Sequence, residues 1–241
     1  MNTGNVIVSG ASSGIGRAIS SRLLQAGYRV TGIARDFSKF PCDEPHFTPV
    51  CMDLADLDTL PAALDELGRQ QTAIDGLVCC AGSGRFGSLE EFSPAQIRAL
   101  LDLNLTSQLY LVRALLPGMK QRGSGNIIFM GSEAALAGGK RGAVYSAAKF
   151  GLRGLAQALR QECAASGLRV SIINPGMVQT PFFNALDFRP GEEPDNYILP
   201  EDVAAAVQLV IEAREGTVFD EINLSPQKKV VRFPKPGDDK S

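Results

Sequence analysis

Short apolar runs alternate along the chain with longer segments in which apolar residues recur every three or four positions. The short runs, rich in Val, Ile, Leu and Cys, predict strands, and the longer segments predict amphipathic helices. The predicted strands lie near residues 5–10, 28–34, 47–52, 75–81, 125–131, 168–174 and 219–224. The predicted helices lie near residues 14–27, 56–71, 94–120, 142–166 and 201–214. This alternation indicates strand–helix–strand units and therefore a parallel sheet.

The predicted strands are apolar at nearly every position, as the runs 6–8, 77–80 and 170–173 illustrate. Strands of this kind are expected where helices cover both faces of a sheet. No internal repeat, low-complexity linker or change in composition divides the chain. We therefore expect an α/β fold, a single-domain Rossmann-like, doubly wound parallel sheet of about seven strands flanked by helices, over residues 1–224.

Two segments depart from this alternation. Residues 181–200 set aromatic residues among acidic ones and are too long for an ordinary connection. They predict either a mobile substrate lid, at about 182–199, or a disordered insertion. Residues 225–241 form a C-terminal tail with several basic residues, which we expect to be a solvated terminus.

The composition narrows the classes of partner. In 241 residues, 24 Lys and Arg stand against 26 Asp and Glu, a net charge of −2, which argues against a broad basic surface for nucleic acid or an anionic membrane. No apolar run reaches the length of a membrane span, and the chain enters its first predicted strand without a signal-like segment. We expect a cytoplasmic protein that acts on a small molecule, with no nucleic-acid or membrane partner.

Cysteine and histidine offer little for metal chemistry. The chain has five cysteines, an odd number without a CxxC pair, and a single histidine, His46. This set contains no plausible zinc site, so we expect reduced thiols and no metal. Acid–base chemistry therefore has to come from another residue type.

A glycine-rich turn joins the first predicted strand to the first predicted helix. Residues 10–16 read Gly-Ala-Ser-Ser-Gly-Ile-Gly, so backbone N–H groups and a helix N-terminus can meet a diphosphate there. Glycine is needed where a side chain would block that approach or where φ is positive. In this strand–turn–helix context the turn predicts dinucleotide binding, against the alternative of a turn that only packs helix on strand.

The same turn also matches Gly10-x-Ser12-x-Gly14, the nucleophile elbow of α/β hydrolases. That alternative makes Ser12 a nucleophile and requires His46 as its base, because the chain has no other histidine. It also places every partner within the next 34 residues of the first strand, which disfavours it.

Two residues bear on which dinucleotide is bound. A carboxylate at the end of the second strand would accept the ribose 2′-OH of NAD, but the chain has Arg35 there, which can pair with a 2′-phosphate. We therefore predict NADP(H), with a solvated Arg35 as the alternative. Asp53, after the third predicted strand, can accept the adenine amino group or cap the helix expected near residue 56.

Tyr145 and Lys149 lie four residues apart in a predicted helix and hence on one face. An adjacent ammonium favours phenolate and lowers the pKa of a tyrosine, and such a pair can shuttle a proton to a carbonyl oxygen. Alone, the Y-x-x-x-K pattern is weak, and it fits an exposed pair better than a catalytic one.

The motifs together resemble the short-chain dehydrogenase/reductase family over residues 5–224. The resemblance rests on the glycine turn, on Cys80-Ala81-Gly82 after the fourth strand, and on Pro175-Gly176 after the sixth, in the family's order and spacing. It implies that Tyr145 is the general acid–base and that Lys149 lowers its pKa and binds the nicotinamide ribose. It implies further that Ser132 holds the substrate oxygen and that Asn104 maintains a water-linked proton relay through Lys149.

The resemblance also assigns the cofactor-binding residues. They are Gly10, Ser12, Ser13, Gly14, Ile15, Gly16, Arg35, Asp53, Leu54, Ala81, Gly82, Tyr145, Lys149, Pro175, Gly176, Val178 and Thr180. The chain departs from the family at Cys80, where asparagine is usual, and a thiol is a weaker hydrogen-bonding group than an amide. A buried structural thiol is the favoured interpretation of Cys80, against a redox switch.

The segments 94–120 and 142–166 carry apolar or small residues on more than one face. Because they resemble the family's dimer helices, we expect a homodimer or homotetramer. The predicted function is an NADP(H)-dependent oxidoreductase that interconverts a carbonyl and a secondary alcohol by hydride transfer. The alternative is a non-catalytic NADP-binding sensor on the same fold. The substrate itself stays open. Lys140 and Arg141 could select an acidic substrate or simply be solvated, and solvation is the favoured interpretation.

Overall fold

Seven parallel strands form the central sheet of the computed structural model, which describes residues 4–38, 40, 43–71 and 73–233. The strands follow the spatial order β3-β2-β1-β4-β5-β6-β8. Their bounds are β1 (Asn5–Ser9), β2 (Arg29–Ala34), β3 (Phe47–Cys51), β4 (Gly76–Cys79), β5 (Gly125–Met130), β6 (Leu168–Pro175) and β8 (Glu221–Leu224). The order reverses between β1 and β4, and in sheets of this type ligands bind in the crevice at the carboxyl ends there. The predicted doubly wound parallel sheet is confirmed.

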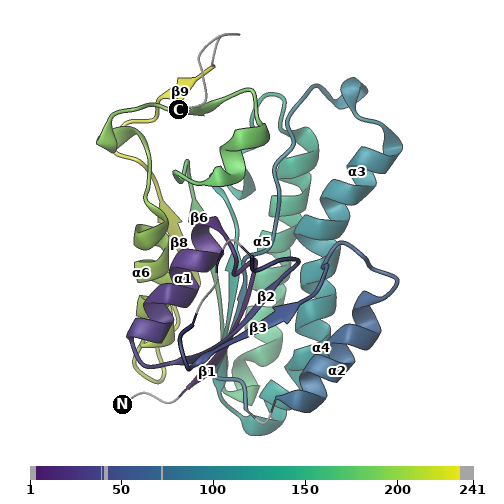
Figure 1. Ribbon diagram of the computed structural model, residues 1–241, viewed down its shortest axis with the longest axis vertical. Coiled ribbons are helices and arrows are strands. Elements are labelled where there is room, and N and C mark those ends of the chain that lie inside the picture. Colours follow the sequence, from purple (N-terminus) through teal and green to yellow (C-terminus); the bar gives the residue numbers. More distant parts are fainter. Residues whose placement is uncertain (1–3, 39, 41–42, 72, 234–241) are drawn as a thin grey trace.

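Helices cover both faces of the sheet (Figure 1). On one face lie α1 (Gly14–Gln25) and α6 (Pro200–Ile211), which share an apolar core with β1, β2 and β6. The other face carries α2 (Leu60–Gln70), α4 (Ser107–Arg122) and α5 (Ala143–Cys163). Burial on both faces explains the apolar strands, because β4 and most of β5 exclude solvent completely.

Two helices begin or run differently from the prediction. The helix expected from residue 56 begins at Leu60, because the Asp56 carboxylate and carbonyl bind Thr59 and Leu60 in a turn that precedes it. The helix expected over 94–120 consists of α3 (Pro94–Leu101), a π-helical turn η2 (Asp102–Thr106) and α4. Such π-helical turns insert an extra residue and occur often at functional sites. This one carries Asn104.

Short elements complete the fold. The 3₁₀ turns η1 (Leu89–Glu91), η3 (Glu133–Ala135) and η4 (Ala164–Ser166) follow β4, β5 and α5. The segment expected to be a lid folds into η5 (Pro181–Ala185), strand β7 (Arg189–Pro190) and η6 (Pro194–Asn196). None of the helices within the described residues has both the length and the apolarity of a membrane span.

The described part of the C-terminal tail pairs with the lid. Strand β9 (Val231–Arg232) is antiparallel to β7, at the top of Figure 1. Gly191 N donates to Val230 O at 3.0 Å, and Lys228 N donates to Asp195 O at 2.8 Å. Backbone bonds and ion pairs thus tie the tail to the lid up to residue 233, although most of its side chains are exposed, as expected of a solvated terminus; residues 234–241 lie outside the described residues.

Candidate active site

The glycine turn after β1 is tightly closed. The φ angle of Gly10 is +71°, and a Cβ there would stand 3.0 Å from Ala81 Cα, in the turn after β4. A Cβ on Gly16 would collide with the carbonyl oxygen of Gly10. Ser13 is the N-cap residue of α1 and makes no side-chain cap bond, so the first-turn N–H groups of the helix are left for a ligand. Ser12 and Ile15 lie in the same turn.

The turn after β4 faces the glycine turn and is held by two residues that sequence reasoning missed. Ser9 Oγ accepts the N–H groups of Cys80 at 2.9 Å and Ala81 at 3.0 Å. Gln108 Nε2 donates to Ala81 O at 3.2 Å. Ser9 is the one polar residue among the four buried positions of β1, a signal that could have pointed to this role. Burial raises the pKa of the Cys80 thiol to about 12, which keeps it protonated.

The segment after β6 closes the other side of the glycine turn. A Cβ on Gly14 would stand 3.4 Å from the side chain of Thr180, so the two turns are in contact. Thr180 Oγ1 donates to Val178 O at 3.3 Å, and Val178 bridges to Ile198 of the lid. Pro175 ends β6, and Gly176 N donates to Leu224 O at 2.8 Å. The structure thus brings together the predicted residues of the turns after β1, β4 and β6.

The remaining predicted cofactor residues follow β2 and β3. Arg35 comes directly after β2, is exposed, and forms no ion pair with any of the residues that the structure describes. The exposed Asp53 accepts a bond from Ala55 N at Oδ1, at 3.0 Å, whereas its neighbour Leu54 is buried. Asp53 therefore caps a turn before α2 and not the helix itself, and its second carboxylate oxygen has no partner within the described chain.

Tyr145 and Lys149 lie on one face of α5, as predicted, and both are buried. Lys149 Nζ stands 5.7 Å from the centroid of the Tyr145 ring and donates to Met130 O, at the end of β5, at 2.9 Å. Ser132 follows β5, accepts a bond from Ala134 N at 3.2 Å, and is hydrogen-bonded to the Tyr145 side chain. A phenol, a hydroxyl and an ammonium therefore meet where β5 and α5 adjoin.

The electrostatics of this group differ from the sequence prediction. Burial raises the pKa of Tyr145 to about 12, the bond from Ser132 opposes that rise, and the charge of Glu133 adds to it. Burial also lowers the pKa of Lys149 to about 8. The predicted lowering of the tyrosine pKa by the lysine is wrong in this structure because the desolvation of the phenolate outweighs the attraction of a lysine whose Nζ donates to a carbonyl. Near neutral pH Tyr145 is a protonated hydrogen-bond donor.

Asn104 lies in η2 and is fully buried. Its Nδ2 donates to Ser83 O at 3.0 Å and Leu100 O at 2.9 Å, and its Oδ1 accepts Ser83 N at 3.3 Å. A Cβ on Gly82 would stand 2.7 Å from Asn104 Oδ1 and 3.8 Å from Lys149 Nζ, so Gly82 separates these two polar groups. The structure therefore places Asn104 beside Lys149, with its amide committed to the turn after β4.

Aromatic rings enclose Tyr145. The rings of Phe86 and Phe182 stand 5.1 and 6.2 Å from it, centroid to centroid. A chain of further ring contacts runs through the lid and the tail, over Phe183, Phe188 and Phe233. The lid therefore covers the phenol with apolar surface.

Of the two neighbouring cations Lys140 and Arg141, Arg141 forms an ion pair with the lid. Arg141, whose φ is +62°, pairs with Asp187 of the lid at 2.8 Å. Lys140 is exposed. Arg141 is exposed, as the sequence favoured, and the lid supplies its counter-ion.

The hydrolase alternative does not survive the sheet topology. Ser12 follows the carboxyl end of β1, whereas His46 precedes the amino end of β3. In parallel strands these are opposite edges, roughly 15–20 Å apart at about 3.3 Å per residue. No nucleophile–base pair can form between them. No group of three or more metal-ligating side chains occurs among the described residues.

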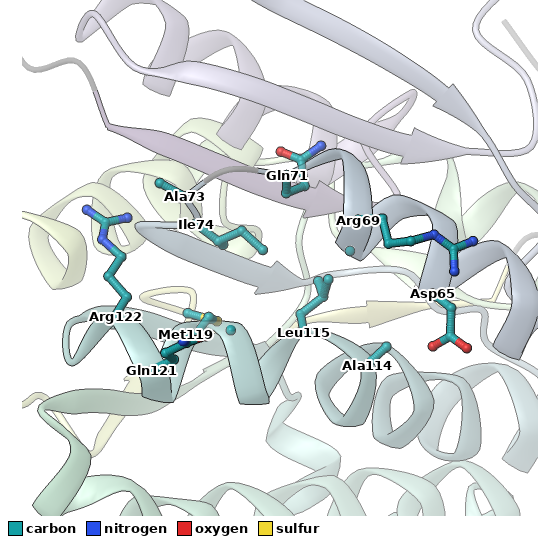
Figure 2. Close-up of a pocket in the computed structure, with 12 residues that line it drawn as sticks. Asp65, Arg69, Gln71, Ala73, Ile74, Ala114, Leu115, Met119, Gln121 and Arg122 are labelled. Atoms are coloured by element: carbon teal, nitrogen blue, oxygen red, sulfur yellow. The ribbon is translucent and has the colours of Figure 1, made fainter.

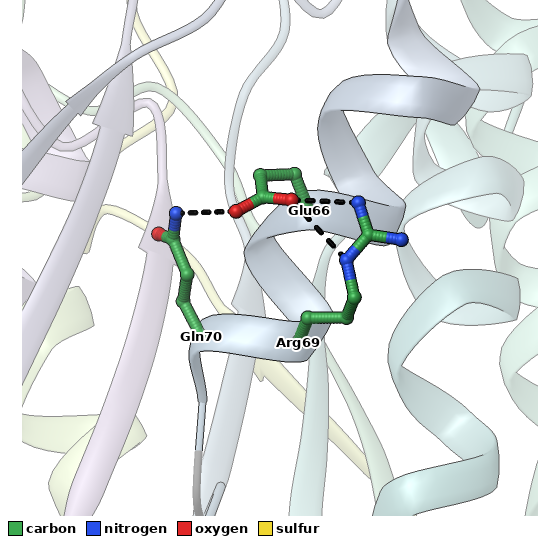
Figure 3. Close-up of polar contacts among 3 residues, drawn as sticks. All are labelled: Glu66, Arg69 and Gln70. Carbon is green, nitrogen blue, oxygen red and sulfur yellow. Dashed lines mark hydrogen bonds and ion pairs between the residues drawn. The ribbon is translucent and has the colours of Figure 1, made fainter.

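A cavity of about 450 Å³ lies between α2 and α4, at the amino edge of the sheet and away from Tyr145 (Figure 2). Ile74, Leu115 and Met119 line its floor, and Arg69 and Arg122 stand at its sides. Arg69 pairs with Glu66, which also accepts a bond from Gln70 (Figure 3), and Arg122 pairs with Asp75. Because both arginines already have carboxylate partners, neither offers an unpaired positive charge to a ligand.

Residues 4–189 match the family model of the short chain dehydrogenases, which covers most of the chain. This chain belongs to the short-chain dehydrogenase family. The family's fold is the one observed, and the matched region contains the glycine turn, Ser132, Tyr145 and Lys149. The expectation drawn from the sequence is confirmed at the level of the family.

Known members resemble this short-chain dehydrogenase along much of its length. A 3-dehydrosphinganine reductase of Arabidopsis thaliana is 35% identical over 190 residues, 74% of this chain and 56% of that protein, so the chain spans little more than half of that relative. An uncharacterized oxidoreductase of Staphylococcus epidermidis is 30% identical over 228 residues, 91% of this chain and 96% of that one. The closed form of a serine dehydrogenase complexed with NADP+ has a TM-score of 0.78 and 26% identity, and the match covers 91% of this chain and 94% of that one.

Proposed function

We propose that this short-chain dehydrogenase is an NADP(H)-dependent oxidoreductase that interconverts a carbonyl and a secondary alcohol. The observation that carries the proposal is the buried Tyr145 phenol, hydrogen-bonded to Ser132 and adjacent to Lys149, at the carboxyl edge that also bears the glycine turn. The name of one relative, 3-dehydrosphinganine reductase, describes the reduction of a ketone and supports this reaction class.

The turns around Gly10 fit a dinucleotide. Gly10 has no side chain where the turn after β1 approaches Ala81 in the turn after β4, and a Cβ at Gly16 would collide with Gly10 O inside the glycine turn. The first-turn N–H groups of α1 would bind the diphosphate, and Arg35 would pair with the 2′-phosphate of NADP(H). Asp53 would accept the adenine amino group with its free oxygen, and Pro175 to Thr180 would line the nicotinamide.

Tyr145 and Ser132 would both donate hydrogen bonds to the substrate carbonyl oxygen. When bound, the reduced nicotinamide supplies a hydride to the carbonyl carbon, which develops negative charge on that oxygen. The raised pKa of Tyr145, about 12, keeps its proton in place until this charge develops, which suits a general acid in the direction of reduction. Lys149 would then return a proton toward the phenol, with Asn104 holding the water-linked path.

The apolar rings around Tyr145 would exclude water from the reacting oxygen. Phe86 and Phe182 flank the phenol, so the carbonyl would have at least one apolar substituent that packs against them. Arg141 would not select an acidic substrate while it pairs with Asp187 of the lid.

The test is turnover on a panel of ketones, aldehydes and hydroxy acids, followed by the absorbance of NADPH. The proposal expects consumption of NADPH with at least one apolar ketone and a large loss in Ser132→Ala. A protein that binds NADPH tightly but consumes none across the panel would instead be the non-catalytic sensor. NAD(H) preferred over NADP(H) would contradict the cofactor assignment.

The homo-oligomer remains part of the proposal. Leu109 on α4 and Phe150 on α5 are large apolar residues with about two fifths of their surface exposed, 40% and 42%. These helices belong to the two segments that resemble the family's dimer helices, and they would pack against the same helices of a second copy. A monomeric mass by light scattering at micromolar concentration would contradict it. A cytoplasmic location stays a prediction from the sequence.

A further inference from the structure

A carboxylate adjoins the serine of the candidate active site. Glu133 follows Ser132 directly and begins η3. Its Oε2 would stand 3.5 Å from a Cβ on Gly176, so the carboxylate borders the segment proposed to line the nicotinamide. Its charge also raises the pKa of Tyr145. In the proposed reduction negative charge develops on the oxygen that Ser132 and Tyr145 hold, and an unpaired carboxylate there would oppose it.

The cation that faces Glu133 comes from the other end of the chain. Lys229 Nζ stands 2.7 Å from Glu133 Oε2, although 96 residues separate the two. The tail reaches this position because Lys228 N donates to Asp195 O and because Val230 O accepts Gly191 N, both from the lid. Pro226 packs beside Gly176, where its Cδ would touch a Cβ at 3.2 Å.

We propose that Lys229 is a positioning residue of the active site, supplied by the C-terminal tail, which holds and neutralises Glu133 beside Ser132 and so favours the developing negative charge on the substrate oxygen. This inference rests on the proposed function. It makes the tail part of the catalytic unit, not an appendage after the domain.

The Lys229–Glu133 ion pair is exposed, so a role in catalysis can be tested apart from a role in folding stability. The side chains of Lys229 and Glu133 are 63% and 36% exposed, and ion pairs so exposed contribute little to folding. Removing Lys229 should therefore leave the protein folded. The remaining Glu133 carboxylate would still act on the enclosed site, because the rings of Phe86 and Phe182 keep water from the phenol.

The experiment compares four variants of the full chain under saturating NADPH and a ketone accepted by the wild type. Lys229→Ala leaves Glu133 uncompensated, and we expect kcat to fall about five- to tenfold, the effect of one unit charge at an intermediate dielectric. Glu133→Gln removes the charge itself, so neither it nor the double variant should show this loss. Lys228→Ala is the matched control, because it breaks the neighbouring ion pair with Asp195 and leaves Glu133 paired.

A fifth variant and two further readouts distinguish the effect of charge from attachment of the tail. Salt should partly restore the kcat of Lys229→Ala, because it screens Glu133, and Lys229→Arg should retain the wild-type kcat. NADPH affinity, measured by its fluorescence without substrate, should be equal in all variants. Equal losses of kcat in Lys229→Ala and Glu133→Gln, without rescue in the double variant, would overturn the inference. They would show that the ion pair only attaches the tail to the domain. An unchanged kcat in Lys229→Ala would also overturn the inference, whereas failure of the proposed function would appear as no turnover in the wild type.

Discussion

Replacing Gly16 with alanine tests whether the closed turn between β1 and α1 is a binding site or only a helix cap. Alanine in a helix is about 1 kcal/mol more favourable than glycine. At Gly16, however, its Cβ would collide with the carbonyl oxygen of Gly10, and backbone cannot rotate away as a flexible side chain can. Overpacking of this kind costs about 1–3 kcal/mol, so we expect a net loss of up to about 2 kcal/mol in the free energy of unfolding.

That loss corresponds to a decrease in Tm of at most about 8 °C for a domain of this size. The effect on NADPH binding should exceed the effect on folding stability, because a displaced turn no longer directs its N–H groups at one phosphate. Loss of one charge-assisted bond is worth about 1.5–3 kcal/mol, which predicts at least a tenfold rise in the Kd of NADPH.

The assay pairs a thermal melt with a fluorescence titration of NADPH. Gly118→Ala is the control, because Gly118 lies within α4 and a Cβ there meets nothing within 4 Å. We expect Gly118→Ala to melt at or above the wild-type temperature and to bind NADPH unchanged. If Gly16→Ala behaved in the same way, the turn would not be a dinucleotide site.

Two further predictions concern Arg35 and Lys149. Arg35→Ala should raise the KM for NADPH about tenfold and leave that for NADH unchanged, whereas Arg29→Ala, at the other end of β2, should change neither; equal effects on both cofactors would contradict the 2′-phosphate assignment. Because burial lowers the pKa of Lys149 from 10.5 to about 8, the unfolded chain binds more protons than the folded one between these values. The free energy of unfolding of the wild type, relative to Lys149→Met, should therefore rise from pH 8 to pH 10 in urea titrations, and a fall or no change would contradict the buried position of the ammonium.

Local patterns predicted most of the fold. The strands of the main sheet were predicted within a few residues. Burial of β1, β2, β4, β5 and β6 on both faces leaves apolar runs that no helix period explains. The π-helical turn at Asn104 was missed, because one extra residue in a helix changes no residue type. The pairing of β7 with β9 was missed as well, because two-residue strands forty residues apart leave no local pattern.

For the candidate site, the positions of the residues could be predicted from the sequence, whereas their electrostatics could not. The family resemblance grouped Ser132 with Tyr145 and Lys149, and the fold brings them together because Ser132 follows β5 and the other two lie in the first two turns of α5. The electrostatics depend on desolvation, which is a property of the whole fold. Neither the raised pKa of Tyr145 nor the partnership of Glu133 with Lys229 could therefore be obtained from the sequence.

The central claim is that the Tyr145 phenol donates a proton to the substrate oxygen. The most direct measurement is kcat of Tyr145→Phe with NADPH and an accepted ketone, beside the Kd of NADPH and a Tyr110→Phe control on α4. General acid catalysis contributes about 10²–10⁴-fold, so we predict a loss of at least about 100-fold in kcat with unchanged NADPH affinity, and wild-type behaviour in the control. A Tyr145→Phe protein that still reduced the ketone within about threefold of the wild-type rate would contradict the account.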